Sequence, residues 1–84
     1  MDLTKQNIAD IARIILKDWG TRLNYAAKPY VDAMLTMNSI KDNYYLDSGT
    51  DIVARFLCNA NSWRGEVARE VKTELKARLK KEGF

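Results

Sequence analysis

The sequence predicts an all-α fold, a compact bundle of four helices. Apolar residues recur with helical period in four segments, about 4–19, 29–38, 48–60 and 62–81, and residues suited to helix caps lie between them. No alternating apolar and polar run, and no Asn-Gly or Asp-Gly dipeptide, predicts a strand or a hairpin. The chain has 84 residues and no low-complexity linker, so we expect one domain, residues 1–84, with a small core.

The first two predicted helices each have a recognisable boundary. The apolar stripe of the first runs to Trp19, and Asp2 or Thr4 is suited to cap its start. Gly20 follows at the position where helices often close with a left-handed residue. The second helix is predicted to begin with Pro29, because a first helical turn has no use for the N–H that proline lacks.

The segment between the second and third predicted helices is too apolar for an exposed loop. Its apolar residues are Ile40, Tyr44, Tyr45 and Leu46. We therefore expect a short extra helical turn near 40–45 that packs its aromatic side chains under the bundle. Ser48 then precedes Asp51 with the spacing of a capping box, which predicts the start of the third helix.

The last predicted helix contains Trp63 and an unusual glycine. Ser62 is suited to be its N-cap, which leaves only a tight corner after the third helix. Trp63 begins its apolar stripe, so we expect this ring to pack against Phe56 or the first helix. Gly65 in a first turn costs about 1 kcal/mol relative to alanine. It therefore indicates the close approach of another backbone, and a simply tolerated glycine is the alternative.

The net charge of the chain is concentrated in its last segment. Residues 1–61 hold seven Lys or Arg and seven Asp, whereas residues 62–84 hold seven Lys or Arg and four Glu, a net charge of +3. A basic helix contacts an acidic protein or a nucleic acid, and a solvated face is the third alternative. Tyrosines in connectors are typical of interfaces. The residues expected to bind a partner are Arg64, Arg69, Lys72, Lys76, Lys80, Tyr44 and Tyr45.

The residue types that catalysis and metal binding need are scarce. The chain has no histidine, which removes the commonest general base and the commonest metal ligand. Cys58 is the only cysteine, and we expect it to be a buried or half-buried small hydrophobe. The aspartates lack metal-ligand spacing, and the glycines form no phosphate-binding loop. We therefore expect no enzyme activity, no metal and no cofactor.

Other features concern the cellular compartment. No segment approaches the roughly 20 apolar residues that span a membrane. The first residues lack the basic and apolar regions of a signal peptide, and a single cysteine fits a reducing compartment. We expect a cytoplasmic protein with no membrane partner, and its oligomeric state stays open.

Three groups of residues form a longer pattern. They are Pro29-Tyr30-Val31-Asp32-Ala33-Met34; Asp47-Ser48-Gly49 with Ile52-Val53, Phe56-Leu57 and Asn59-Ala60; and Trp63-Arg64-Gly65-Glu66 with Ala68 and Lys72-Thr73-Glu74-Leu75-Lys76. The pattern covers roughly residues 27–79 and resembles small all-α proteins of unknown function from bacteriophages and prophages. The resemblance implies a short protein in the host cytoplasm that binds something of the host's. Anti-CRISPR proteins are one such kind, and no site residues carry over.

The expected function is that of a non-catalytic protein that binds and modulates a macromolecular partner with an acidic surface, for example as an inhibitor. The alternative is a small nucleic-acid-binding or transcription-regulating domain that uses the basic C-terminal helix. A helix-turn-helix formed by the last two predicted helices is disfavoured, because their turn lacks glycine. In addition, Trp63 and Glu66 occupy positions where polar base-reading residues are expected.

Overall fold

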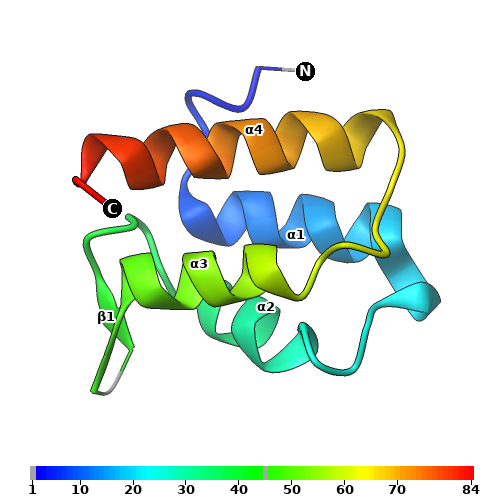
Figure 1. Cartoon of the computed structure of the whole chain (residues 1–84), viewed down its shortest axis with the longest axis horizontal. Helices are drawn as coiled ribbons and strands as arrows, with labels where there is room; N and C mark the ends of the chain where they lie inside the picture. The colour runs from blue at the N-terminus through cyan, green and yellow to red at the C-terminus, as the bar shows by residue number, and fades with distance from the viewer. Residues whose placement is uncertain (1, 45) are drawn as a thin grey trace.

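Four α-helices make up most of the computed structural model, which describes residues 2–44 and 46–84 (Figure 1). The prediction of a mostly helical chain with four helices is confirmed. One short antiparallel strand pair accompanies them in the described residues. The elements in chain order are α1 (Ile8–Trp19), the 3-10 helix η1 (Gly20–Arg22), α2 (Lys28–Met34), β1 (Asn43–Tyr44), β2 (Asp47–Ser48), α3 (Gly49–Cys58) and α4 (Glu66–Lys81).

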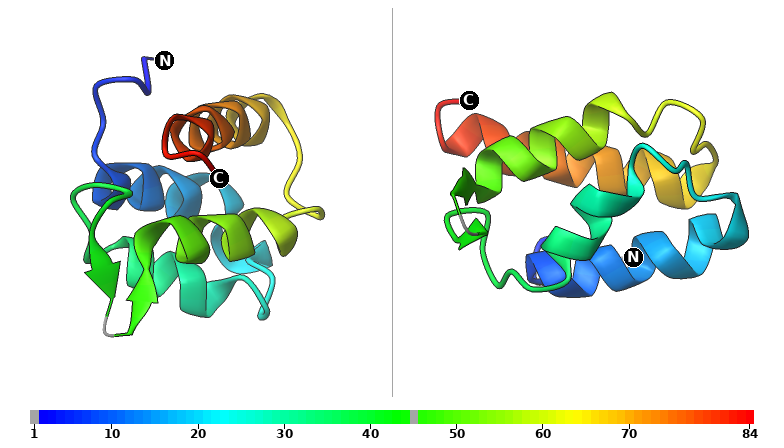
Figure 2. Two further views of the ribbon diagram at one scale, coloured as in Figure 1. Left: turned by 60° about the vertical axis from the view of Figure 1, so that its left-hand side comes forward. Right: turned by 90° about the horizontal axis from the view of Figure 1, so that it is seen from below.

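The helices contact one another in a closed cycle. Helices α1 and α3 each pack against both α2 and α4 (Figures 1 and 2). Helices α3 and α4 run in opposite directions, and residues 59–65 connect them at one end of the molecule (Figure 1). The strand pair and the C-terminus lie at the other end of the molecule, opposite the connector (Figure 1).

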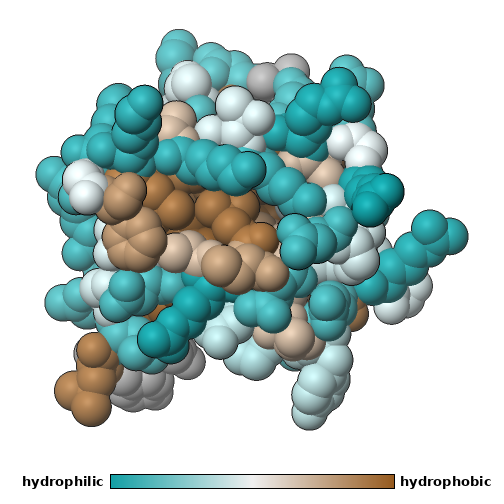
Figure 3. All heavy atoms as spheres, viewed as in Figure 1, coloured by the Kyte–Doolittle hydropathy of each residue, from teal (hydrophilic) through white to brown (hydrophobic). Residues whose placement is uncertain are grey.

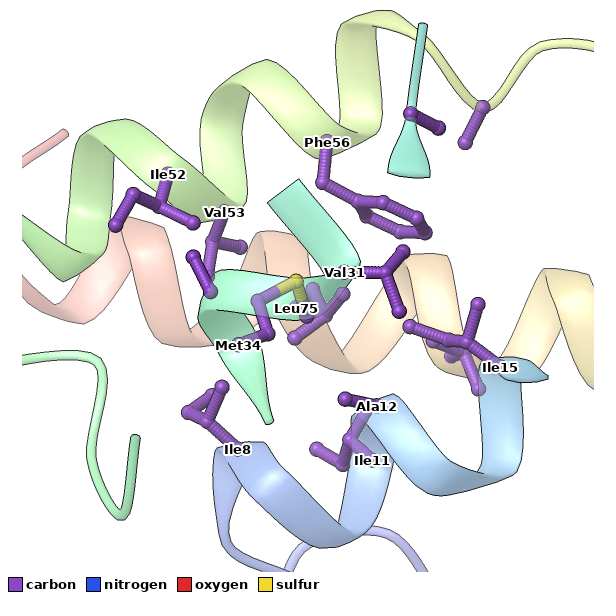
Figure 4. Packing of buried hydrophobic residues seen from close by; sticks show 14 of the residues in the cluster. Ile8, Ile11, Ala12, Ile15, Val31, Met34, Ile52, Val53, Phe56 and Leu75 are labelled. Carbon is purple, nitrogen blue, oxygen red and sulfur yellow. The ribbon is translucent and has the colours of Figure 1, made fainter. Parts of the chain in front are cut away.

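Side chains from all four helices meet in one apolar core (Figure 4). Ile11 of α1, Val31 of α2, Phe56 of α3 and Leu75 of α4 are each fully buried. No polar or charged side chain is buried among the described residues. The fold is therefore stabilised mainly by removing apolar surface from water.

Helix α1 begins at Ile8, so the predicted start near residue 4 is wrong. Asn7 is the N-cap, and its side-chain oxygen accepts a hydrogen bond of 2.7 Å from the backbone N–H of Asp10. The carboxylate of Asp2 instead accepts from the backbone N–H and the hydroxyl of Thr4, at 3.1 and 2.6 Å. Asp2 thus closes a local turn in the segment that precedes the helix.

The boundaries after Trp19 differ in detail from the predictions. Gly20 has a positive φ of 58°, as expected, but its ψ of −134° lies outside the left-handed helical region, and the chain continues as η1. Pro29 lies in the first turn of α2, as predicted. That helix ends at Met34 rather than near 38, because the backbone N–H and the hydroxyl of Thr36 both donate to Ala33 O, three residues back.

The predicted helical turn near 40–45 is wrong, and the strands β1 and β2 occupy this region. Ile40 is buried, whereas Leu46 is fully exposed although the segment is apolar. Tyr45 and the side chain of Tyr44 lie outside the described residues. The burial and partner contacts expected for these two tyrosines therefore stay predictions.

The start of α3 explains why this loop is extended. Ser48 is the N-cap, as predicted, and its hydroxyl accepts a hydrogen bond from the N–H of Asp51 at 3.2 Å. The N–H of Gly49 donates to Asp42 O at 2.7 Å. A Cβ at Gly49 would lie 2.6 Å from that oxygen and 2.7 Å from Met37 Cε. The loop backbone thus packs directly on the start of α3, and the hydrogen bond uses a carbonyl that a helical turn would require.

Helix α4 begins at Glu66, so the predicted N-cap Ser62 and the tight corner are both wrong. Gly65 is the N-cap, and its φ of 114° and ψ of −176° lie in a region that is essentially open only to glycine. A Cβ at Gly65 would meet nothing within 4 Å. Backbone conformation, and not the predicted approach of a second backbone, therefore explains this glycine.

Candidate partner-binding site

Trp63 attaches the connector of residues 59–65 to helix α1. Its ring stacks on Trp19 with centroids 5.5 Å apart and planes 10° from parallel, and it packs at 64° to Phe56 with centroids 6.3 Å apart. Its Nε1 donates a hydrogen bond of 2.9 Å to the carboxylate of Asp18. The predicted packing of Trp63 is confirmed in both forms, since the ring contacts Phe56 and the first helix together.

Lys72 holds the same connector from helix α4. Its Nζ donates a hydrogen bond of 2.6 Å to the carbonyl oxygen of Trp63. Partial burial lowers the pKa of Lys72 from its usual 10.5, and the like charges of Lys76 and Arg64 lower it further. Positive charge therefore accumulates around the point where the connector meets α4.

A surface hollow of about 300 Å³ lies beside Lys72 at the start of α4, and we call it the basic hollow. Its lining residues are Trp63, Arg64, Gly65, Ala68, Arg69 and Lys72. Three of them are cationic and none is acidic. Arg64, Arg69 and Lys72 form no salt bridge with a carboxylate of residues 2–44 or 46–84. Arg69 also borders a neighbouring hollow that is lined by Asp2, Glu70 and Glu74, so the acidic side chains nearest the cluster lie outside the basic hollow.

A second hollow, of about 360 Å³, shares Trp63 and Arg64 with the basic hollow, and we call it the mixed hollow because both signs of charge line it. Its lining residues are Asp18, Trp19, Arg22, Ser62, Trp63 and Arg64. Sequence analysis did not single out Arg22. No local pattern marks it, because only the docking of Trp63 on Trp19 brings the connector to η1.

The remaining basic residues of α4 have different surroundings. Lys76 is exposed and affects the pKa of Lys72, but it lines neither hollow. Lys80 is also exposed, near the C-terminal end of α4 and away from both hollows. The structure therefore brings together only Arg64, Arg69 and Lys72 of the basic residues predicted to bind a partner.

Tyr25 and Cys58 are both exposed at the surface. Tyr25, in the connector after η1, is 90% exposed and so is available for contact. Cys58 is exposed, so its predicted burial is wrong. It follows buried Phe56 by two residues, and at 3.6 residues per turn this places Cys58 on the opposite side of α3.

The described residues offer no metal site or membrane span. No group of three or more His, Cys, Asp and Glu residues is arranged there to hold a metal ion. None of the helices in this part of the chain is both long enough and apolar enough to cross a bilayer.

An apolar strip lies on the molecular face seen in Figure 1, between α4 and α3, with hydrophilic side chains around it (Figure 3). Phe84, at the end of the chain, is 61% exposed. Nothing in the structure indicates what would cover the strip. The basic hollow, whose charge specifies a ligand chemistry, is the better-defined candidate.

No protein-family model, curated protein or solved structure matches this chain. The resemblance to bacteriophage proteins stays a prediction, and the function is inferred from the geometry of this surface.

Proposed function

We propose that this chain is a non-catalytic binding protein that engages and modulates a partner protein with an acidic surface. Its contact surface is the connector of residues 59–65 with the adjoining part of α4. The observation that supports this proposal is the basic hollow, where Arg64, Arg69 and Lys72 gather without an acidic lining residue. Clustered positive charge attracts acidic surfaces and accelerates their association.

The distribution of ion pairs strengthens the contrast between this surface and other parts of the molecule. Several cations elsewhere are neutralised by carboxylates within their own helix. These pairs are Arg13 with Asp10 at 2.6 Å, Lys28 with Asp32 at 2.9 Å and Arg78 with Glu74 at 2.7 Å. Arg64, Arg69 and Lys72 differ from these cations in that they line one hollow together and form no such pair within the described chain.

An acidic protein fits this surface better than a nucleic acid does. Trp63 lines the basic hollow but is 2% exposed, and Trp19 behind it is 5% exposed. Neither ring is available to stack on a base.

The resemblance to bacteriophage proteins extends the proposal to the identity of the partner. On this basis the partner is a host or phage protein, and binding inhibits it, as with anti-CRISPR proteins. This part of the proposal rests on the residue pattern between 27 and 79.

A pull-down from bacterial lysate, with and without nuclease, tests the proposal. The parent chain is compared with Arg64→Glu/Arg69→Glu, and Lys5→Glu/Arg55→Glu is the matched control, because all four side chains are exposed. The proposal expects a protein with an acidic surface that survives nuclease, is lost with the first variant and is kept with the control. Retention of nucleic acid alone would support the rival function, and retention by Arg64→Glu/Arg69→Glu would exclude this surface.

A further inference from the structure

We infer that the basic hollow is the anchor of the interface and that it takes a carboxylate group from an acidic peptide segment of the partner. The inference rests on the proposed function, since it names the chemical group that the partner supplies. It goes further by separating the residues that bind this group from those that only attract it.

The backbone framework of the hollow and one of its cations, Lys72, are held in place by contacts with the rest of the fold. Lys72 is fixed by its 2.6 Å hydrogen bond to Trp63 O, and the Trp63 ring is fixed by its stack on Trp19. Arg64 follows Trp63 directly, so its backbone is positioned by the same contacts. Binding to an ordered site loses less conformational entropy than binding to a mobile one.

The side chains suit a carboxylate. A guanidinium group presents N–H donors in a planar fork that matches the two oxygens of a carboxylate, and Arg64 and Arg69 both line the hollow. Neither has a carboxylate partner among the described residues. Gly65 and Ala68 contribute little side-chain volume to the lining, which leaves space for the incoming group.

The size of the hollow limits what it holds. Its volume of about 300 Å³ lies at the lower end of the range for small-molecule pockets, roughly 300–1,000 Å³. A side chain that ends in a carboxylate fits this space, and the rest of the acidic segment would lie across the exposed surface. The anchor is therefore a small group presented by a larger partner.

The mixed hollow is a poorer place for an anion. The carboxylate of Asp18 lines it and accepts the hydrogen bond from Trp63 Nε1, so a negative charge is already present there. Arg22 lines only this hollow, and Lys80 lines neither. We assign to these two residues attraction at a distance and no direct contact with the anchoring carboxylate.

A nuclear magnetic resonance titration with a polyglutamate peptide tests the inference. The backbone amides of Gly65 and Ala68 report on the hollow directly, because both residues line it. We expect saturable shifts of these amides. We also expect Arg64→Gln/Arg69→Gln to weaken binding at least about tenfold, as for charge-assisted hydrogen bonds. Both arginines are exposed and unpaired in the described chain, so the variant should stay folded, as circular dichroism would verify.

Two control variants distinguish binding at the basic hollow from a nonspecific effect of net positive charge. Lys80→Gln/Lys81→Gln removes the same charge from exposed positions at the other end of α4, and Arg22→Gln removes one charge from the mixed hollow. We expect each control to weaken binding less than about threefold, the range of exposed ion pairs.

The outcomes distinguish this inference from the proposed function. If Lys80→Gln/Lys81→Gln weakens peptide binding as much as Arg64→Gln/Arg69→Gln does, then the basic hollow is not the anchor. The same conclusion would follow if the peptide shifts other amides of α4 and not those of Gly65 and Ala68. Neither result would contradict the binding of an acidic partner. A polyglutamate peptide that shifts no amide would count against both. Tighter binding of tripolyphosphate at the same amides would make the hollow a phosphate site and overturn the carboxylate assignment.

Discussion

Trp63 and Trp19 form a nearly parallel stack, with ring centroids 5.5 Å apart and planes 10° from parallel. Trp19 ends helix α1, whereas Trp63 lies in the connector before α4, so the stack joins distant parts of the chain. Phe56 packs at steep angles against both rings, with centroid distances of 6.4 and 6.3 Å. Because Arg64 follows Trp63, the contact that closes this end of the core also positions the basic hollow.

The first prediction concerns the stability that Trp63 provides. Trp63→Ala should lower the free energy of unfolding by about 3–5 kcal/mol, as for other buried aromatic residues. Small domains have a total of about 5–15 kcal/mol, so the effect should be large. Urea unfolding followed by circular dichroism would measure it.

Tyr25→Ala is the matched control for that prediction. Tyr25 is 90% exposed, so its removal should change the free energy of unfolding by no more than about 0.5 kcal/mol. Similar unfolding midpoints for Trp63→Ala and Tyr25→Ala would show that the stacked pair contributes little to the fold.

Gly65 gives a prediction about backbone conformation. Gly65→Ala should destabilise the chain by about 1–3 kcal/mol, because an L-residue is strained at a φ of 114°. A D-alanine at this position, introduced by chemical synthesis, should restore the melting temperature, since positive φ suits a D-residue. An equal loss with both forms of alanine would instead indicate a steric contact, which the open space around a Cβ here argues against.

The existence of the four helices could be predicted from apolar periodicity, but their starts could not. Asp2, Thr4 and Asn7 are all able to cap a helix, and local sequence does not choose among them. The backbone N–H of Ile8 donates to Asn38 O at 3.1 Å, which fixes the first turn of α1 from the loop after α2. A contact between residues so far apart in the chain is not visible in a local pattern.

For the candidate site, too, the sequence composition predicted some residues, whereas others depend on how the chain folds. The concentration of charge was enough to single out Arg64, Arg69 and Lys72, which the structure brings to one hollow. The same reasoning also selected Lys80, because charge along a sequence does not show how far along a helix a hollow extends. Arg22 was missed because its place beside Arg64 depends on how the connector docks.

Lys72 provides a prediction about proton binding. Its pKa in the folded chain lies below the usual 10.5, because of partial burial first and then the charges of Lys76 and Arg64. Between the folded pKa and 10.5, the unfolded chain binds more protons at Lys72 than the folded chain does. The contribution of Lys72 to the free energy of unfolding therefore rises with pH through this window, as a penalty present at lower pH is relieved.

A titration of the Lys72 Cε resonance would check this assignment. Its midpoint should lie below 10.5 and should rise in Arg64→Gln without reaching 10.5, because burial is the largest cause and remains. A midpoint at or above 10.5 in the parent chain would contradict it. If Arg64→Gln leaves the midpoint unchanged, then the charge of Arg64 does not lower the pKa of Lys72.

The last prediction concerns Arg78, which connects the N-terminal segment to α4. Its Nε donates to Glu74 Oε2 at 2.7 Å and its Nη2 donates to Leu3 O at 2.7 Å, so the guanidinium bridges two groups. Arg78→Lys keeps the charge but replaces the planar fork with one ammonium group. We expect a loss of about 1–3 kcal/mol in the free energy of unfolding. Hydrogen exchange should also accelerate at the Gln6 amide, which donates to the same Leu3 oxygen.

Arg69→Lys is the control for Arg78→Lys, because Arg69 is exposed and forms no salt bridge in the described chain. It should change the free energy of unfolding by less than about 0.5 kcal/mol. Arg78→Lys could have an equally small effect and leave exchange at Gln6 unchanged for one of two reasons. Either the lysine ammonium group binds both Glu74 and Leu3 O, or the Arg78 contacts add nothing to stability. Arg78→Met decides between them, because its removal of the charge destabilises the chain only if the ammonium group had replaced those contacts.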